Sequence, residues 1–361
     1  MVTSWVKWKS RALMALHTGS VRLYVTLFLS AAVLLYPFFL WYGYQEKQFL
    51  IFQTADETGA TNTSKVHEVI CPPNAEHCFK VEDFVTGDIY ARRLMVEADE
   101  DVVLSVAELI NERDEPFTRK NSRNWPIRKE HLLLGYSKVT IAQAFATGTF
   151  ILGTPDSVFR TLMIGLGGAG ILHYISTLPG NHEIISVDVE PAMEYIATKW
   201  FGVTASRRHQ IVIQDGVDFL AGRSNWAPKF DFIVIDACHI DLEDEYELLC
   251  PAKPFVEDEV IGHIRRLLSS KGTVAVNTFV LETPENAEEV KHARVKLMDA
   301  FKRHFNNCYY ADEYVNKILT CTLSLNLMMT QTFYRQIMDA LPDKLKRELR
   351  FRDVQIIHDI L

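Results

Sequence analysis

Apolar residues follow two different patterns along this chain of 361 residues. Residues 23–42 form an unbroken uncharged run, whereas after residue 65 the apolar positions occur in short runs separated by polar ones. As a helix, a run of about 20 residues spans roughly 30 Å, the thickness of the hydrocarbon core of a bilayer. The pattern predicts a transmembrane helix over 23–42, between a cytosolic tail at 1–22 and a linker at 43–65. A cleaved signal peptide is the alternative, but the run is longer than the apolar part of such a peptide and no small-residue cleavage site follows it.

The charges that flank this run predict its orientation. Four basic residues and no acid precede it, namely Lys7, Lys9, Arg11 and Arg22, whereas the charges after it are mixed. Under the positive-inside rule, the amino terminus is cytosolic and the catalytic domain lies in a lumen or outside the cell. The sequon at Asn62 agrees with this orientation, as do Cys71 and Cys78, which are close enough in sequence to pair. The other four cysteines fall in or near predicted core strands and are expected as buried thiols: Cys238, Cys250, Cys308 and Cys321.

Residues 66–150 predict a small β-rich domain followed by a connecting helix. Apolar positions alternate over 80–85 and 89–95, and turn residues separate the two runs at 86–88, as in an antiparallel hairpin. Helical spacing follows at 132–145, after a charged segment that contains two prolines.

From residue 151 onward, strands and helices alternate, which is typical of a doubly wound α/β domain. We expect a Rossmann-like, seven-stranded sheet over 151–324, whose last two strands pair antiparallel around a tight turn at 315–317. The tail at 325–361 has helical periodicity and is expected to form a helical extension. The expected strands are 162–165, 184–189, 211–214, 232–235, 273–280, 308–314 and 318–323.

A glycine-rich turn follows the first of these strands. Gly165, Gly167 and Gly170 match the spacing G-x-G-x-x-G, and Gly168 lies between them. A main chain that must come close to a nucleotide cannot carry a Cβ, and the start of the next helix offers unpaired N–H groups. The four glycines are therefore candidate cofactor-binding residues.

Acids end the next three strands, at the edge where ligands bind in such sheets. Asp188, Asp215 (followed by Gly216) and Asp236 each follow their own strand. A nicotinamide cofactor would explain the glycines and Asp188. S-adenosyl-L-methionine explains all three acids, because one would hold the ribose, one the adenine amino group and one the methionine end or the acceptor. Each acid has an alternative role as a helix N-cap, and this is the role expected for Glu190.

Composition excludes several other functions. The net charge of −8 and the absence of a basic stripe argue against a nucleic-acid surface. The histidines and cysteines show no metal-ligand spacing, and no G-x-S-x-G nucleophile elbow is present.

Several motifs together resemble the spermidine-synthase-like class I methyltransferases that use S-adenosylmethionine. The similarity is greatest to the carboxy-terminal domain of the methyltransferase-like protein 13 group. It is carried by MIGLGGAG (163–170), VDVEP (187–191), ATKWFG (197–202), DGVDFL (215–220), FDFIVID (230–236) and CPAKPFV (250–256), with YARRL (90–94) and SVAE (105–108) in the small domain.

The resemblance implies a role for each candidate residue. Asp188 would bind the ribose, Asp215 with Gly216 the adenine, and the glycine turn the methionine part of the methyl donor. That group methylates protein, including translation elongation factor 1-alpha, so a protein or small amine acceptor is expected, and relatives often form homodimers through the small domain. If the acceptor is an amine, Asp236 or His239 is the candidate that takes its proton.

Two departures bear on the alternatives. Polyamine synthases have a serine and aspartate cluster after the fourth strand, where this chain has residues 236–241, and a glutamine where it has Leu104. An aminopropyltransferase is therefore the second hypothesis. The third is a membrane-tethered binding module without catalysis.

Overall fold

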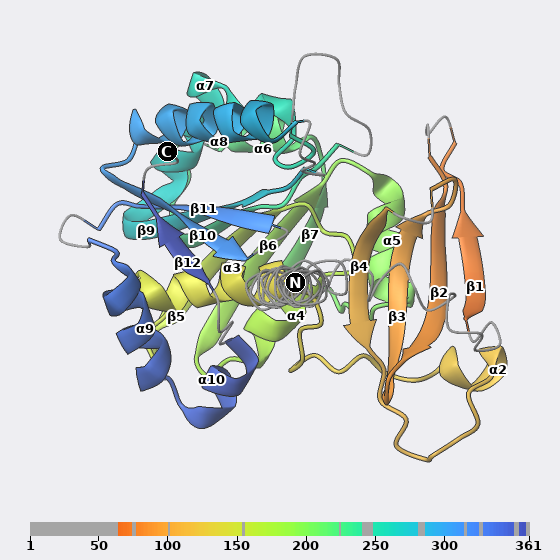
Figure 1. The fold of residues 1–361 in the computed structure, drawn as a ribbon. Coiled ribbons are helices and arrows are strands. Elements are labelled where there is room, and N and C mark those ends of the chain that lie inside the picture. The colour runs from red at the N-terminus through yellow and green to blue at the C-terminus, as the bar shows by residue number, and fades with distance from the viewer. Residues whose placement is uncertain are drawn as a thin grey trace, which may run out of the picture. The chain divides into compact units, whose positions relative to one another are not determined.

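The structure is a computed structural model that describes residues 64–73, 77–99, 102–153, 156–223, 225–239, 248–280, 286–313, 316–324, 328–349 and 354–358 (Figure 1). The predicted membrane helix at 23–42, its amino-terminal flank and the sequon residue Asn62 lie outside these residues. Among the residues that are described, no helix is both long and apolar enough to cross a bilayer.

The predicted small antiparallel sheet is confirmed. Its strands are β1 (Lys65–Ile70), β2 (Phe79–Thr86), β3 (Ile89–Val96) and β4 (Val103–Glu108), and each pairs antiparallel with its neighbour in chain order. Gly87, at φ +57°, adopts the left-handed conformation that the tight β2–β3 turn requires. The Cys71–Cys78 disulfide closes the connection between β1 and β2, as the spacing of the two residues indicated.

The connection to the large sheet contains the short α2 (Arg119–Ser122) and the longer α3 (Gly135–Ala146). Buried residues occur all around α3, which is typical of a helix enclosed on every side. It is held to the large sheet by Tyr309, whose hydroxyl donates to Gln143 Oε1 at 2.9 Å.

The α/β alternation is also confirmed, but the strand count was wrong. The described residues form a sheet of eight strands in the order β12-β10-β11-β9-β8-β5-β6-β7. The strands from β5 to β9 are parallel, and β11, β10 and β12 extend that sheet in antiparallel fashion. The missed strand, β12, has three residues, too few to show a period of two in the sequence. The strands are β5 (Val158–Ile164), β6 (Asn181–Asp188), β7 (His209–Ile213), β8 (Phe230–Ile235), β9 (Leu268–Thr278), β10 (Asn307–Glu313), β11 (Asn316–Thr322) and β12 (Gln355–Ile357).

Helices cover both faces of the large sheet (Figure 1). Alternate residues of β5 show the two layers, because Met163 packs into one apolar cluster whereas Leu162 and Ile164 pack into the other. The first cluster includes side chains of α3, α4 (Gly170–Thr177), α5 (Pro191–Lys199), α9 (Gln331–Ala340) and α10 (Asp343–Leu349). The second includes side chains of α6 (Gly216–Gly222), the 3₁₀ helix η1 (Lys253–Val256), α7 (Asp258–Leu267) and α8 (Ala287–Lys302).

Four cysteines that were expected as free thiols form disulfides instead. Cys308 and Cys321 lie opposite each other on β10 and β11, with Cα atoms 4.2 Å apart, and they are bonded. Cys238 and Cys250, in the loops beyond β8, form the other bond. The prediction was wrong because apolar neighbours indicate that a cysteine is buried, but they do not reveal which residue lies across from it.

A buried ion cluster joins the small sheet to the α/β domain. Arg92 of β3 donates to Asp83 of β2 at 2.7 Å, and to the main-chain carbonyls of Trp200 and Ser122 at 2.7 and 2.9 Å. Burial by itself would raise the pKa of Asp83, but the hydrogen bonds from His67 and Arg92 hold it below its ordinary value. Since Trp200 is the C-cap of α5, a single guanidinium connects the small sheet to a helix of the α/β domain.

We expect Arg92→Ala to lower the free energy of unfolding by about 3–5 kcal/mol, because it leaves the buried Asp83 carboxylate without its main cation. Urea-induced unfolding followed by circular dichroism measures this. The matched control is Arg113→Ala, whose side chain is 85% exposed, and it should change the same free energy by less than about 0.5 kcal/mol. Equal losses in the two variants would contradict a role for Arg92 in joining the sheets.

Candidate functional site

The strand order creates a switch point at the centre of the large sheet. β5 pairs with β6 on one side and with β8 on the other, so the chain leaves β5 in one direction and later returns on the other side. Loops that follow the carboxyl ends of such neighbouring strands diverge and leave room for a ligand. The glycine turn, Asp188, Asp215 and Asp236 all follow strands at this edge, as predicted.

The structure explains three of the glycines by close packing. Gly165, at φ +99°, faces the main-chain carbonyl of Asp236, and a Cβ built there would collide with that oxygen. Gly167, at φ +47°, and Gly168 lie against Ser105 of the small sheet. Ser105 Oγ accepts the Gly168 N–H at 2.7 Å. By contrast, a Cβ at Gly170, the first residue of α4, would meet nothing within 4 Å.

Asp188 supports the glycine turn with its side chain. One carboxylate oxygen accepts the Leu166 N–H at 2.8 Å, and the other accepts the Glu190 N–H at 2.9 Å. Burial raises the pKa of Asp188 above its ordinary value, although the main-chain N–H groups act in the opposite direction. A carboxylate offers about four acceptor positions, so Asp188 keeps capacity for a ligand hydroxyl. Its position therefore fits the predicted role at a ribose.

Asp215 and Glu190 both act as helix caps. Asp215 is the N-cap of α6, and its Oδ1 accepts the N–H groups of Val217 and Asp218 at 2.8 and 3.0 Å. Glu190 is the N-cap of α5, which confirms the role expected for it. Asp215 is an exposed residue at the edge of the sheet where the strands end. Gly216 is packed against Ile164 and Phe255. The predicted contact of Asp215 with adenine remains a prediction.

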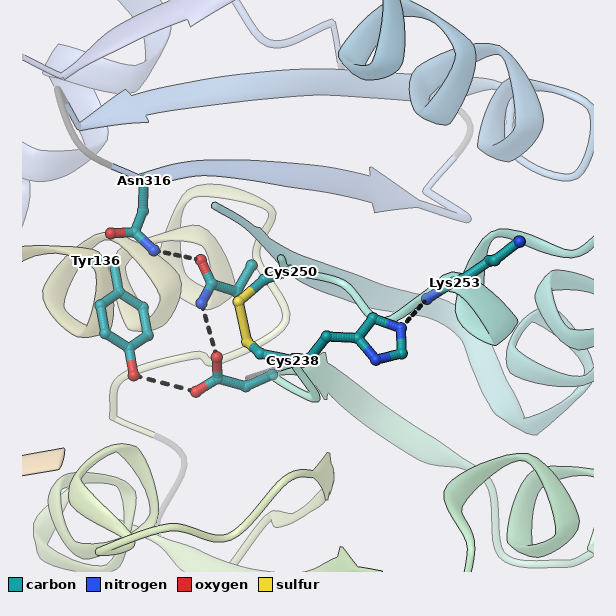
Figure 2. The surroundings of a disulfide bond; sticks show 8 residues. Tyr136, Cys238, Cys250, Lys253 and Asn316 are labelled. Atoms are coloured by element: carbon teal, nitrogen blue, oxygen red, sulfur yellow. Dashed lines mark hydrogen bonds between the residues drawn. A yellow bond between two sulfur atoms is a disulfide. The ribbon is translucent and has the colours of Figure 1, made fainter. Parts of the chain in front are cut away.

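Asp236 is held by two donors from distant parts of the chain (Figure 2). Tyr136, at the start of α3, donates its hydroxyl to Oδ2 at 3.1 Å, and Asn277 of β9 donates its amide to Oδ1 at 2.8 Å. Asn316, at the start of β11, donates in turn to Asn277 Oδ1 at 2.7 Å. Residues of α3 and β9 thus contact the carboxyl group that follows β8, and a residue of β11 holds one of these two donors.

These surroundings set the protonation state of Asp236. Burial raises its pKa to about 6, even though the hydrogen bonds from Asn277 and Tyr136 lower it. Burial and the nearby Asp236 charge raise the pKa of Tyr136 well above its ordinary value, so the phenol stays protonated and remains a donor. A carboxyl group that titrates close to neutral pH is suited to accepting and releasing a proton.

His239 lies in the same loop but faces other partners. Its Nε2 accepts the Lys253 N–H at 3.1 Å, and its main-chain N–H donates to Leu249 at 2.8 Å. The ring is therefore tied toward η1, whereas the Asp236 carboxyl is turned toward Tyr136 and Asn277. The structure unites Asp236 with those two residues rather than with His239.

Sequence reasoning missed Tyr136, Asn277 and Asn316. Tyr136 lies 100 residues before Asp236 and belongs to no local motif. One signal was available for Asn277, which is the only amide among the apolar and threonine residues of 273–280. A polar side chain inside a buried strand needs a partner, and here that partner is the candidate site.

A separate cavity of about 190 Å³ lies near the amino ends of β6 and β7. None of the predicted site residues lines it. Its lining is Lys129, His173, Ser176, Gly180, His182, Ile184, Val203, Thr204, Ser206, Arg208 and His209.

Comparison with known proteins identifies distant relatives, although no family model matches the chain. The eEF1A lysine and N-terminal methyltransferase of Mus musculus is 25% identical over 232 residues, which cover 56% of this chain and 32% of the relative. The protein of the same name from Homo sapiens is 27% identical over 226 residues, covering 55% and 31%. The chain thus spans about a third of the length of the curated relatives that it matches.

A solved structure shares the fold. The structure of a probable spermidine synthase from Corynebacterium glutamicum superposes with a TM-score of 0.55 at 15% identity, over 82% of this chain and 91% of that one. Methyltransferases as sequence relatives, together with this fold, confirm the resemblance to spermidine-synthase-like methyltransferases. They also agree with the predicted enzyme class and its S-adenosylmethionine cofactor.

We expect Tyr136→Phe to raise the pKa of Asp236 from about 6 to about 7. The lost hydrogen bond stabilises the charged carboxylate by about 1.5 kcal/mol, so its removal favours the protonated form. A pH titration of the Asp236 carboxyl carbon by NMR measures the change. Tyr195→Phe, which removes an exposed hydroxyl bonded to Glu68, serves as the control and should leave this pKa unchanged. A pKa that stays at about 6 in Tyr136→Phe would show that the phenol does not contribute.

Proposed function

We propose that this chain is a membrane-anchored, S-adenosylmethionine-dependent methyltransferase that acts on an amine of a protein. The observation that carries the proposal is the contact between the glycine turn and Asp236. It brings a nucleoside-binding turn next to a carboxyl group with a pKa of about 6. Such an arrangement provides a place for a methyl donor and a proton acceptor beside it.

The residues at this edge fit the methyl donor. Asp188 has spare acceptor capacity for ribose hydroxyls, and Asp215 with Gly216 stands at the end of β7, where the adenine would lie. The glycine turn would lie against the methionine part. When bound, S-adenosylmethionine supplies a methyl group on a positively charged sulfur, and acids around the site suit that charge.

Methyl transfer requires little acid-base catalysis from the protein. The acceptor must be aligned with the methyl group, so positioning supplies most of the catalysis. An ammonium group must lose a proton before it can accept the methyl group, and we assign Asp236 as the base that takes this proton. Asn277 and Tyr136 orient the Asp236 carboxyl, and both hydrogen bonds lower its pKa and so favour the ionised form that can take a proton.

The chemical class of the methyl acceptor is inferred from the relatives and from Asp236, the candidate proton acceptor. The relatives are named for methylation of lysine and of the amino terminus of eEF1A, and both of these groups are amines. We therefore propose a lysine side chain or an amino terminus as the acceptor. The likeness to a probable spermidine synthase concerns the fold, and the departures after β8 argue against aminopropyl transfer.

The disulfides support the proposed topology. Three are present, and stable disulfides form in oxidising compartments. This agrees with a membrane helix at 23–42, a cytosolic amino terminus and a catalytic domain in a lumen or outside the cell. We also propose a homodimer through the edge strand β1, where Val66 and Val69 are 41% and 46% exposed.

Calorimetry with S-adenosylmethionine and the full chain tests the methyl-donor site. We expect Asp188→Asn to weaken binding by about ten- to a hundredfold, because a hydrogen bond to a charged group is worth about 1.5–3 kcal/mol. Glu194→Gln is the matched control, since this exposed acid lies on α5 beyond the site, and it should bind like the wild type. The unfolding temperatures of both variants separate loss of a ligand contact from loss of the fold. A wild-type chain that does not bind the methyl donor, or equal affinities for wild type and Asp188→Asn, would refute the proposal.

Glycosylation tests the proposed topology. We expect the full chain, expressed in a eukaryotic cell, to migrate faster after glycosidase treatment, because Asn62 would face the lumen. Asn62→Gln should abolish this shift. Digestion of the catalytic domain by a protease added to the cytosolic side of sealed vesicles would show the opposite topology.

A further inference from the structure

The Cys238–Cys250 disulfide connects the loop that follows Asp236, the candidate proton acceptor, to the segment 248–253 (Figure 2). Cys238 follows Asp236 by two residues. Cys250 pairs in an isolated antiparallel bridge with Phe279, which follows Asn277 by two residues. The disulfide therefore joins the segment after β8 to the segment that lies on the end of β9.

Three hydrogen bonds between described residues also join these two segments. Ala252 N–H donates to the Ala237 carbonyl at 2.8 Å, and His239 N–H donates to the Leu249 carbonyl at 2.8 Å. Lys253 N–H donates to His239 Nε2 at 3.1 Å. We call the two segments, 237–239 and 248–253, the acceptor wall. The Leu249 and Cys250 N–H groups also donate to the Phe279 carbonyl, and the Phe279 N–H donates to the Cys250 carbonyl, so segment 248–253 is anchored to the end of β9. The disulfide is the covalent link between this segment and 237–239.

The methyl-donor side is held independently of the disulfide. Asp236 N–H donates to the Ile164 carbonyl at 2.8 Å, and Gly165 N–H donates to the Val187 carbonyl at 2.8 Å. The Asp236 carbonyl also packs on Gly165. These bonds continue the ladder of the central parallel strands, so they persist without a bond between Cys238 and Cys250.

The disulfide is open to reductants, unlike the one in the sheet. Cys238 is an exposed residue, whereas Cys308 and Cys321 are 4% and 0% exposed. Thiol–disulfide exchange requires a thiolate to reach one of the sulfur atoms. We therefore expect a dithiol to react at Cys238 under conditions that leave the Cys308–Cys321 bond intact.

We propose that Cys238–Cys250 is a reducible brace of the acceptor wall, and that its reduction by a dithiol loosens this wall while the methyl-donor side stays formed. This rests on the proposed function, because it places the methyl acceptor against the acceptor wall. In the reaction, a thiolate of the dithiol attacks Cys238 Sγ, and Cys250 leaves as a thiolate that takes up a proton. The second thiol then attacks the mixed disulfide and releases Cys238, so two electrons and two protons pass from the dithiol to the cysteine pair.

Hydrogen exchange read by mass spectrometry tests the brace on the full chain. We expect Cys238→Ser with Cys250→Ser to speed amide exchange in 248–253 at least about tenfold, while peptides over 160–170 keep their rates. The matched control is Cys71→Ser with Cys78→Ser, which removes the other partly exposed disulfide and should leave 248–253 unchanged. Wild type treated with dithiothreitol should behave like the first variant, and that variant should show no further change on treatment.

Calorimetry with S-adenosylmethionine on the same samples locates the effect. We expect the dissociation constant for S-adenosylmethionine of the variant with Cys238→Ser and Cys250→Ser to stay within about threefold of the wild-type value. Unchanged amide exchange in 248–253 of the variant with Cys238→Ser and Cys250→Ser would overturn the proposal. Faster exchange over 160–170, or loss of methyl-donor binding in that variant alone, would overturn it as well. Failure of the wild type itself to bind the methyl donor would refute the proposed function instead, and the exchange data would still report on the brace.

Discussion

The contact between Gly165 and the main chain of Asp236 is the constraint on which the candidate site depends. Gly165 is the first residue after β5 and has a φ of +99°. Any side chain there would collide with the main-chain carbonyl of Asp236. The absence of a Cβ lets the loops after β5 and β8 touch at the switch point of the sheet. Backbone packing thus fixes the glycine turn next to Asp236, the two parts that the proposed function assigns to the methyl donor and to the acceptor.

That close packing also explains the unusual carboxyl group. Raising the pKa of Asp236 from 3.8 to about 6 corresponds to about 3 kcal/mol of preference for the neutral form. Two hydrogen bonds only partly offset the loss of hydration. A purely structural role would be served at less cost by an asparagine, which needs no ionisation. A carboxyl group with a raised pKa has the property that a proton acceptor near neutral pH needs, and this is why the proposed function assigns that role to Asp236.

The sequence predicted what depends on local periodicity and on strand ends. The parallel strands, the glycine turn, the Glu190 cap and the antiparallel pair of β10 and β11 all follow from short patterns. What it could not predict depends on contacts across the fold. Cys308 faces Cys321 only because the register of β10 and β11 places them together. The grouping of Tyr136 and Asn277 around Asp236 likewise requires α3 and β9 to be placed against β8, and no stretch of sequence encodes that meeting by itself.

The strand-end acids Asp188 and Asp215 already bind main-chain N–H groups at the positions where ligand contacts are proposed. Asp215 uses one oxygen to cap α6, and Asp188 uses both of its oxygens to hold the turn and the start of the α5 connection. Main-chain N–H groups fix the carboxylate plane in each case, so the remaining lone pairs already point in set directions. A ligand hydroxyl or amino group then meets an acceptor that loses little side-chain freedom on binding, which is how a rigid site gains affinity.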